Sequence, residues 1–367
     1  MKIGILTQPL RYNYGGLLQN FALQTVLKRM GHEVITLDAP MLPKYSVFGW
    51  LARIVRRTVM KSIGKDVRVF SEFHLKRENQ RICVNTYKFV DKYISKKTIG
   101  REKRDDYDAL IVGSDQVWRP AYNKNNLYDQ FLQFAKDWKG VTRLAYAASF
   151  GIDYWEFNKK QTYVCKSLVS LFDGVTVRES SGITLCKKYL GVDAECVLDP
   201  TFLLDMKDYV EICGIDKYPK SKGNLLCYIL VENETTRSIK QDISKELGLE
   251  YFDTNVFSLP DNQMRVQKPV EEWLRGFFDA EFVLADSFHA CAFAIIFNKP
   301  FAVLANPQRG NARFDHILGL FNQEYRLITD YHDFLNKKDM LTNSPDVHDQ
   351  IQKLRKESLG FLSKYLS

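Results

Sequence analysis

Three polar residues, Asp286, Ser287 and His289, interrupt the apolar stretch FVLADSFHACAFAIIFNKPFAVL at residues 282–304. They lie where an apolar strand, EFVLAD, gives way to an apolar helix, SFHACAFAIIF. Ligands of parallel α/β sheets bind beyond the carboxyl ends of strands, and a helix that begins there offers unpaired N–H groups to an anion. With His289 as a further donor or proton source, the segment predicts a phosphate or carboxylate site. Alternatively, Ser287 only caps the helix, Asp286 ends the strand and His289 packs with a satisfied ring.

Two arginines follow the next expected strand, in the stretch NPQRGNARFDH at residues 306–316. Successive strand ends of a βαβ unit lie at one edge of the sheet, so Arg309 and Arg313 are expected to approach His289. Arginine suits bidentate recognition of a carboxylate or a phosphate. The alternative is a solvated loop.

Further candidate residues lie in three segments of the first half of the chain. Arg178 and Glu179 end the strand VTVRE, where they form either part of a site or a structural ion pair. Asp115, in VGSDQVW, follows another strand and is either a sugar-hydroxyl acceptor, a general base or a helix cap. The loop YNYGG places Asn13 and Tyr14 ahead of a helix but lacks a nucleotide-binding signature, so it predicts either an acceptor-binding loop or a tight turn.

Alternating apolar strands and amphipathic helices must position these residues. Residues 1–204 indicate one doubly wound α/β domain, with strands such as KIGILT, EVITLDA and DALIV and a basic helical insertion at about residues 43–104. A second series of strands and helices occupies residues 205–330, and residues 331–367 form a charged helical tail. The expected fold class is α/β, with two Rossmann-like domains and a central cleft.

Composition limits the class of protein. The chain has 367 residues, 45% of them hydrophobic, which suits two soluble domains. No apolar stretch approaches the roughly 18 residues of a membrane span, and the N-terminal apolar run is too short for a signal peptide, so a cytoplasmic location is expected. Seven scattered cysteines without a C-x-x-C pair, and six histidines without ligand spacing, predict neither a disulfide framework nor a metal site.

The net charge of +8 is concentrated in one segment. Residues 53–104 hold 16 Lys/Arg and 5 Asp/Glu, which leaves 36 and 39 for the rest of the chain. Residues 50–70, WLARIVRRTVMKSIGKDVRVF, mix basic and apolar side chains. Such a segment either lies on an anionic membrane surface or packs on the domain with a solvated basic face. No nucleic-acid reader motif accompanies the charge, so a nucleic-acid partner is not expected.

In order, seven stretches resemble the polysaccharide pyruvyltransferase family over residues 2–321. They are KIGILT with YNYGGLLQNFALQTVLKRMGHEV, YDALIVGSDQVW, LAYAASFG, VTVRES, VLDPTFLL, ADSFHACAFAIIFNKPF and RGNARFDHILGLF. The resemblance implies a two-domain fold like that of the GT-B glycosyltransferases. The chain departs from the family at one point: the family commonly reads S-F-H-G-T, whereas Ala290 and Cys291 follow His289 here.

The resemblance also implies a reaction, in which pyruvate passes from phosphoenolpyruvate to two hydroxyls of one sugar in a surface-polysaccharide precursor. A cyclic ketal forms and phosphate is released; phosphoenolpyruvate is the donor substrate, and no cofactor is expected. The residues assigned to the donor anions are Arg178, His289, Arg309 and Arg313, with Ser287 beside them. His289 is also the expected general acid, and Asp115 or Asp286 orients or deprotonates the sugar hydroxyls.

The acceptor implied by the family is a glycan, often lipid-linked, which gives the basic segment a role at the inner face of the cytoplasmic membrane. Two other functions stay open. A GT-B glycosyltransferase that uses a sugar nucleotide would need a base platform and a ribose acceptor, and neither is identified in the sequence. A non-catalytic glycan-binding protein of the same fold is the other alternative.

Overall fold

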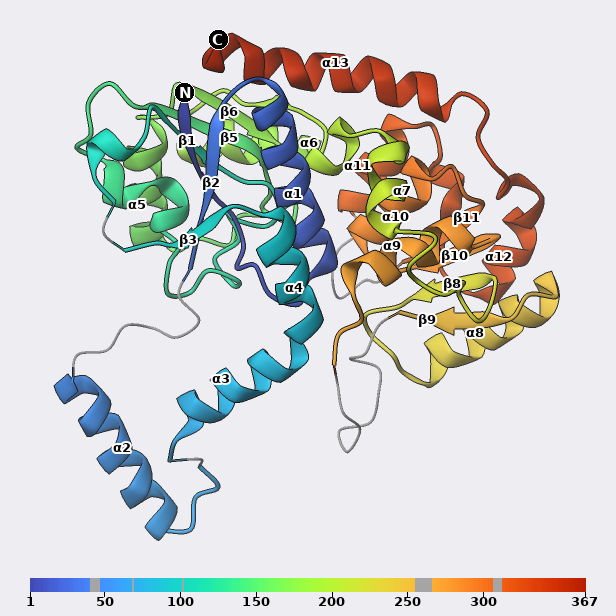
Figure 1. Cartoon of the computed structure of the whole chain (residues 1–367), viewed down its shortest axis with the longest axis horizontal. Coiled ribbons are helices and arrows are strands. Elements are labelled where there is room, and N and C mark those ends of the chain that lie inside the picture. The colour runs from blue at the N-terminus through green and yellow to red at the C-terminus, as the bar shows by residue number, and fades with distance from the viewer. Residues whose placement is uncertain (40–46, 68, 101, 255–265, 306–311) are drawn as a thin grey trace.

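The computed structural model describes residues 1–39, 47–67, 69–100, 102–254, 266–305 and 312–367. Figure 1 shows two α/β domains side by side, each built around its own sheet of parallel strands. The expected fold class, α/β with two Rossmann-like domains, is confirmed.

The first sheet has seven parallel strands. From edge to edge they are β3 (Lys96–Thr98), β2 (Glu33–Asp38), β1 (Lys2–Leu6), β4 (Ala109–Val112), β5 (Thr142–Ala148), β6 (Gly174–Val177) and β7 (Glu195–Cys196). Strands β4 and β6 are buried along their whole length, as expected for parallel strands covered on both faces. Strand order reverses between β1 and β4, which creates the kind of edge at which α/β proteins bind ligands. The helices of this domain include α1 (Tyr14–Arg29), α4 (Val84–Tyr93), α5 (Lys159–Val169) and α6 (Ser180–Leu185).

The second sheet has five parallel strands. Their order is β12 (Leu327–Ile328), β11 (Phe301–Leu304), β10 (Phe282–Ala285), β8 (Leu225–Tyr228) and β9 (Tyr251–Asp253). Its helices are α7 (Met206–Cys213), α8 (Glu234–Leu247), α9 (Val270–Asp279), α10 (Phe288–Ile296), α11 (Ala312–Leu320) and α12 (Tyr331–Lys337). Strand order reverses between β8 and β10, so the start of α10 lies at the switch point of this sheet.

The C-terminal helix α13 (Val347–Leu366) leaves the second domain and packs on the first, across the top of Figure 1. Gly174 in β6 accommodates it, because a Cβ at this position would lie 2.8 Å from the Tyr365 ring and 2.9 Å from the Phe361 ring. Arg355 donates hydrogen bonds to the carbonyls of Phe202 and Leu204, each at 2.7 Å. Within the segment 331–367, expected as a charged tail, α13 therefore contributes to the core of the first domain.

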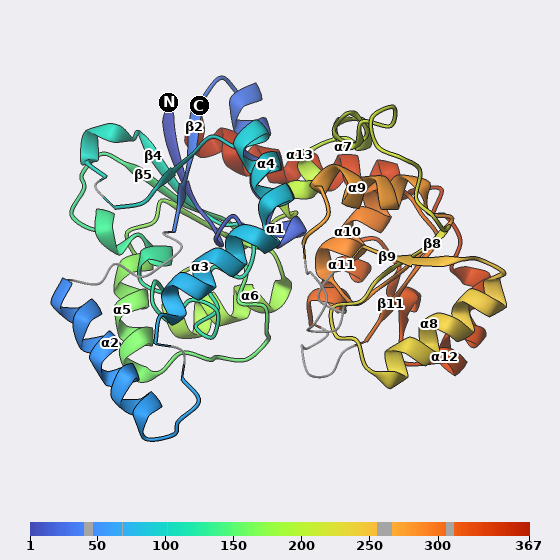
Figure 2. The ribbon, with the colours of Figure 1, turned by 60° about the horizontal axis from the view of Figure 1, so that its bottom comes forward.

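A continuous apolar interface joins the two domains. Tyr14, at the start of α1, stacks on Trp273 of α9 with ring centroids 5.3 Å apart. Its hydroxyl donates a hydrogen bond to the carbonyl of Lys268 (3.0 Å). Figure 2 shows α1 and α10 close together between the domains, so the N-terminal ends of both helices meet at the junction.

Helices α2 (Val47–Ser62) and α3 (Ser71–Ile82) form a hairpin that projects from the first domain (Figure 1). Trp50 packs edge to face on Phe73, and Arg57 forms an ion pair with Glu72, so the two helices hold each other. Within the part of the chain that the structure describes, no helix combines the length and apolarity needed to span a bilayer.

Replacing Phe361 by Ala should lower the free energy of unfolding by about 3–5 kcal/mol, because a buried aromatic side chain of α13 is lost from the core. Tyr163→Ala on α5 is the control, since that side chain is 78% exposed, and its effect should stay within about 0.5 kcal/mol. Urea unfolding followed by circular dichroism measures both. Equal effects would show that α13 is not docked on the first domain in solution.

Candidate active site

The loop after β4 directs the polar side chains of Ser114 and Asp115 into the first domain. Gly113 has φ +123°, and a Cβ there would lie 2.1 Å from the carbonyl oxygen of Tyr146, so the position requires glycine. The next peptide, Gly113–Ser114, is cis, and Asp115 follows with φ +73°. Gln19 of α1 accepts a hydrogen bond from the Ser114 N–H (3.1 Å). This turn directs the side chains of Ser114 and Asp115 toward the carboxyl end of β6.

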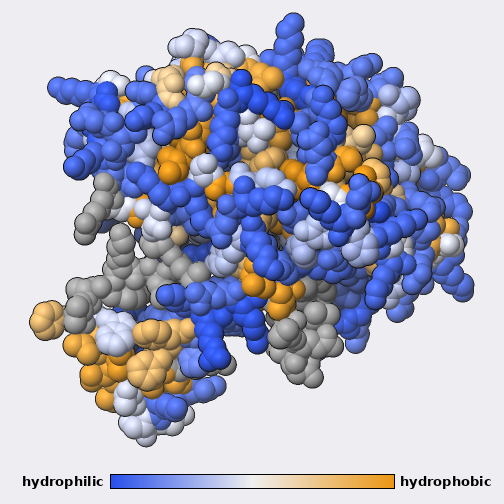
Figure 3. Space-filling model, in the orientation of Figure 1, coloured by the Kyte–Doolittle hydropathy of each residue, from blue (hydrophilic) through white to orange (hydrophobic). Residues whose placement is uncertain are grey.

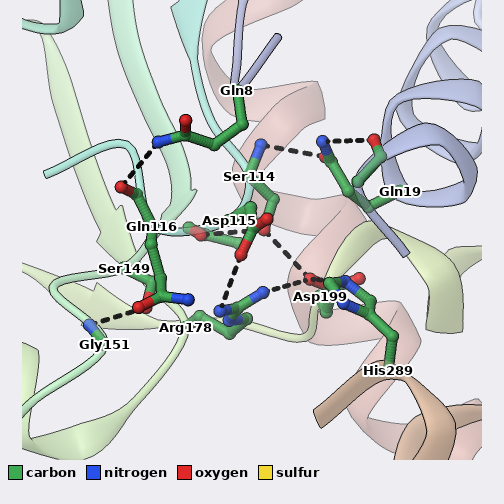
Figure 4. Close-up of polar contacts among 12 residues, drawn as sticks. Gln8, Gln19, Ser114, Asp115, Gln116, Ser149, Gly151, Arg178, Asp199 and His289 are labelled. Carbon is green, nitrogen blue, oxygen red and sulfur yellow. Dashed lines mark hydrogen bonds and ion pairs between the residues drawn. The ribbon is translucent and has the colours of Figure 1, made fainter. Parts of the chain in front are cut away.

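Asp199 is the centre of the resulting cluster (Figure 4). It is 2% exposed and follows β7, where its Oδ1 caps a short 3₁₀ helix by accepting from the N–H and Oγ1 of Thr201. Its Oδ2 accepts from Ser114 Oγ (3.0 Å) and from Arg178 Nη1 (3.1 Å). Burial alone would raise the pKa of this carboxyl, but His289 and Arg178 outweigh burial and hold the pKa well below its usual range. Asp199 is therefore a buried, ionised carboxylate.

Arg178 connects Asp199 to the other carboxylates. Its Nη2 donates to Asp115 Oδ1 (3.3 Å), and its Nε lies 3.9 Å from Glu179 Oε2. Phe288, from the second domain, lies 4.2 Å below the guanidinium. Burial opposes the charge on Arg178, but the three carboxylates overcome this effect and raise its pKa. The guanidinium is thus held in place from both domains and largely neutralised.

His289 contributes from the first turn of α10. It is 6% exposed, and its Nε2 lies 3.7 Å from Asp199 Oδ2, beyond hydrogen-bond distance. A Cβ added to Gly15 of α1 would lie 2.1 Å from Cγ and Nδ1 of His289, so the glycine lets the imidazole pack directly on the helix. The contact explains why YNYGG carries glycines: they admit a side chain of the other domain.

Arg313, near the start of α11, lies within the electrostatic reach of the same cluster. Burial and the charge of Arg178 lower its pKa to about 10, against the opposing effect of Glu179 and Asp115. It remains protonated at neutral pH. Arg309 lies outside the described residues.

Three buried nitrogens in this region lack a hydrogen-bond partner among the described residues: Arg178 Nε, His289 Nε2 and Arg313 Nε. Buried polar atoms are normally satisfied, so such a group of donors points to a ligand. Two of them come from the second domain and one from the first. The arrangement can bind an anion or move a proton only at the junction of the domains.

Asn13 also reaches the cluster. It is the residue before α1, and its Nδ2 donates to Asp115 Oδ2 (3.4 Å). Asp115, 4% exposed, therefore receives one donor on each oxygen. Of the residues selected from the sequence, Asn13, Asp115, Arg178 and His289 lie together in the structure.

The remaining candidates have other surroundings. Tyr14 is fully buried in the domain interface, and burial raises the pKa of its hydroxyl. Asp286 accepts backbone hydrogen bonds from Leu230 (2.7 Å) and Val231 (3.3 Å), so its carboxylate holds the turn after β8. Ser287 occupies the N-cap position of α10, but its side chain makes no capping hydrogen bond.

Ala290 and Cys291, where the sequence departs from the family pattern, are fully buried in the apolar core. Burial raises the pKa of the Cys291 thiol, which behaves as a small apolar side chain there. Asp199, by contrast, was not selected from the sequence. Its only signal was an Asp-Pro pair directly after an apolar strand, in VLDPTFLL.

A cleft of about 440 Å³ opens between the two domains next to the cluster. Its lining comprises Asp153, Ser180, Ser181, Asp315, His316, Gly319 and Leu320. Burial and the nearby charge of Asp153 raise the pKa of Asp315. His316 Nε2 lies 3.2 Å from Cys196 Sγ across the domain boundary. In the described part of the chain, no three His, Cys, Asp or Glu side chains group as a metal site.

The structure thus defines a two-domain α/β protein, with one parallel sheet in each domain and a polar cluster and a cleft at their junction. The chain belongs to the polysaccharide pyruvyl transferase family, whose family model matches residues 13–308. It is accordingly a transferase of polysaccharide biosynthesis. The family expected from the sequence is confirmed. A search of curated proteins found no match.

Solved structures resemble the chain at low identity. The UDP-GlcNAc 2-epimerase of Methanocaldococcus jannaschii, in complex with UDP-GlcNAc and UDP, is 12% identical with a TM-score of 0.49, over 94% of this chain and 93% of that one. The UDP-GlcNAc 2-epimerase of Neisseria meningitidis, bound to UDP-GlcNAc, is 10% identical with a TM-score of 0.47, over 99% and 100%. Arabidopsis thaliana UGT89C1, complexed with UDP, is 9% identical with a TM-score of 0.46, over 97% and 94%.

Asp199→Asn should lower the free energy of unfolding by about 3–5 kcal/mol at neutral pH, because Arg178 then stays buried without its closest compensating charge. Asp193→Asn is the matched control. Asp193 pairs with Lys187 at the surface with its side chain 88% exposed, and its loss should cost less than about 1 kcal/mol. Urea unfolding measures both, and a loss no greater than that of the control would contradict the role given to Asp199.

The same proteins test the ionisation of Asp199. Folding lowers its pKa, so below the unfolded value of about 3.9 the unfolded state binds more protons than the folded state. The stability from this carboxylate is present above that pH and is lost as pH falls further. Wild-type protein should therefore lose more stability than Asp199→Asn during acidification.

Gly15→Ala should destabilise the protein by about 1–3 kcal/mol, because the new methyl group overlaps the His289 ring and must displace it. Gly360→Ala in α13 is the control: nothing lies within 4 Å of the added Cβ, so it should be neutral or stabilising by up to about 1 kcal/mol. Thermal unfolding compares the two. Equal behaviour would mean that α1 and His289 do not pack closely in solution.

Proposed function

We propose that this transferase moves pyruvate from phosphoenolpyruvate to two hydroxyls of one sugar in a surface-polysaccharide precursor, forming a cyclic ketal and releasing phosphate. The observation that carries the proposal is the set of unpartnered buried nitrogens on Arg178, His289 and Arg313. Phosphoenolpyruvate presents a carboxylate and a phosphate, which require cationic donors in a desolvated site.

Arg178 and Arg313 differ in how far nearby carboxylates compensate their charges. Arg178 faces three carboxylates, so it offers its Nε N–H and a fixed orientation rather than net positive charge. Arg313 supplies charge that is less compensated, since its pKa is lowered by burial and by Arg178. We assign the donor anions chiefly to Arg313, with Arg178 Nε as an additional donor, and we keep Arg309 as a further candidate.

His289 is proposed as the general acid. Its Nε2 is free of protein hydrogen bonds among the described residues, and Asp199 stands 3.7 Å away to orient the ring. The His289 proton passes to the methylene carbon of phosphoenolpyruvate, which becomes a methyl group, and the first sugar hydroxyl attacks the adjacent carbon.

The attacking hydroxyl gives its proton to a base, for which Asp115 is favoured because it lies in the cluster. The second hydroxyl then attacks the same carbon, the bond to the phosphate oxygen breaks, and phosphate leaves with the second proton. Asp286, which holds a backbone turn, is the weaker candidate for handling these protons.

The interdomain cleft is the proposed acceptor site. Asp153 and Asp315 offer carboxylate oxygens to sugar hydroxyls, and Ser180 and Ser181 follow Arg178 and Glu179 directly in sequence. We propose a lipid-linked sugar as the acceptor, which would bring the protein to the inner face of the cytoplasmic membrane. No metal or cofactor takes part in the proposed steps.

Incubation with phosphoenolpyruvate and pyranoside acceptors should release phosphate and add the mass of a pyruvate ketal to the sugar. His289→Ala should reduce this turnover by about 10²–10⁴-fold, while His332→Ala, at an exposed histidine of α12, should leave it unchanged. A fully active His289→Ala enzyme would remove His289 from the mechanism. Thermal stabilisation by a nucleotide sugar and not by phosphoenolpyruvate would favour a glycosyltransferase, and sugar binding without phosphate release would favour a non-catalytic glycan-binding protein.

A further inference from the structure

Helix α2 carries apolar side chains on two opposite faces. One face, with Trp50, packs on Phe73 of α3. The other carries Phe48, Leu51, Val55, Val59 and, just past the helix, Ile63. The spacing of three or four residues places these five on one stripe of the helix.

This outward stripe, residues Phe48, Leu51, Val55, Val59 and Ile63, is exposed to solvent. Each of its side chains is between 46% and 84% exposed. Figure 3 shows the apolar surface over α2 at the lower left, at the tip of the projecting hairpin. Phe70, Phe73 and Leu75, at the start of α3, are also exposed, although Phe73 packs on the opposite face of α2. A contiguous apolar patch of this kind marks an interaction surface rather than a core.

Basic residues accompany the outward stripe. Residues 47–82 contain nine Lys/Arg and three Asp/Glu, whereas the rest of the chain holds 43 and 41. Arg56, Lys61 and Lys65 are exposed beside the stripe. The hairpin therefore carries a net charge of +6 out of the +8 of the whole chain.

We infer that the outward stripe of α2 binds the surface of an anionic lipid bilayer. The five apolar side chains enter the boundary between headgroups and acyl chains, and the neighbouring Arg and Lys side chains contact lipid phosphates. The charge argues against a second copy of the chain as the occupant, because two facing hairpins would each present the same excess of positive charge at short range.

The hairpin is joined to the catalytic body through α4. Phe89 and Tyr93 of α4 pack on Phe21 of α1, the helix whose first turn contacts His289. The carbonyl of Ile82, at the end of α3, accepts a hydrogen bond from the N–H of Gln267 (2.9 Å). The base of the hairpin thus lies next to the domain junction, and the link to acceptor chemistry rests on the lipid-linked acceptor of the proposed function.

Flotation of the whole protein with vesicles tests the inference. Wild-type protein should float with vesicles that contain about one-third phosphatidylglycerol and should remain unbound with phosphatidylcholine alone. Val55→Asp/Val59→Asp should abolish the binding. Leu171→Asp, at an exposed residue of the body, is the control for apolar loss and should bind as wild type does.

The charge contribution is tested separately. Arg56→Gln/Lys65→Gln should weaken binding to the anionic vesicles by about 25-fold, since each basic residue near such a surface contributes about 1 kcal/mol, or about fivefold. Lys187→Gln/Lys188→Gln on the body changes the net charge equally and should have no effect. A higher salt concentration should weaken vesicle binding by the wild-type protein more than binding by Arg56→Gln/Lys65→Gln.

Several results would overturn the inference: no flotation with the anionic vesicles, equal binding to neutral vesicles, or wild-type binding by Val55→Asp/Val59→Asp. A dimer in light scattering that this variant dissociates, without vesicle binding, would assign the stripe to a second copy. Circular dichroism checks folding, and Phe48→Asp, at the most exposed position, replaces the double variant if it misfolds. Binding is measured without phosphoenolpyruvate, so its failure is distinct from failure of the proposed reaction.

Discussion

The burial of one ionised carboxylate, Asp199, determines how the parts of this site fit together. An unpaired charge in such a place would be very costly, so the surrounding structure must supply compensating groups. Ser114 comes from the loop after β4, Arg178 from the end of β6 and His289 from the second domain. Each group is held by its own element, and the elements can approach only because Gly15 and Gly113 leave room for a side chain and a carbonyl. The sheet order, the sharp turn at β4 and the docking of α10 on α1 thus meet one electrostatic requirement.

The site is shared between two domains that are joined by one apolar core. Tyr14 stacks on Trp273, and the C-terminal helix returns from the second domain to the first. These apolar contacts hold His289 opposite Asp199. Such an arrangement would favour the proposed transfer, because fixed groups need not reorient as charge develops. The same shared core implies that loss of the domain contact removes the site along with the stability.

The Arg178 cluster, the adjoining cleft and the α2–α3 hairpin differ in charge. The cluster around Arg178 sets one guanidinium against three carboxylates, with Arg313 as a further cation beside it. The adjoining cleft carries Asp153 and Asp315, which suit a hydroxyl-rich ligand better than an anion. Most of the net positive charge instead lies on the projecting α2–α3 hairpin. A donor anion, a sugar and a lipid surface would each meet a region of suitable charge.

Apolar periodicity and ordered motifs are local properties, and they were enough to predict the two parallel α/β domains, the family, and Asp115, Arg178 and His289 as residues at or just beyond strand ends. Which polar residues meet depends on how the whole chain folds. Asp199 lies 85 residues from Ser114, and its role rests on that contact. Tyr14 and Asp286 were chosen as site residues, yet one packs in the domain interface and the other holds a backbone turn. The outward stripe of α2 is a similar case. Helical spacing in the sequence shows an apolar face, but only the packing in the structure shows whether another element covers that face.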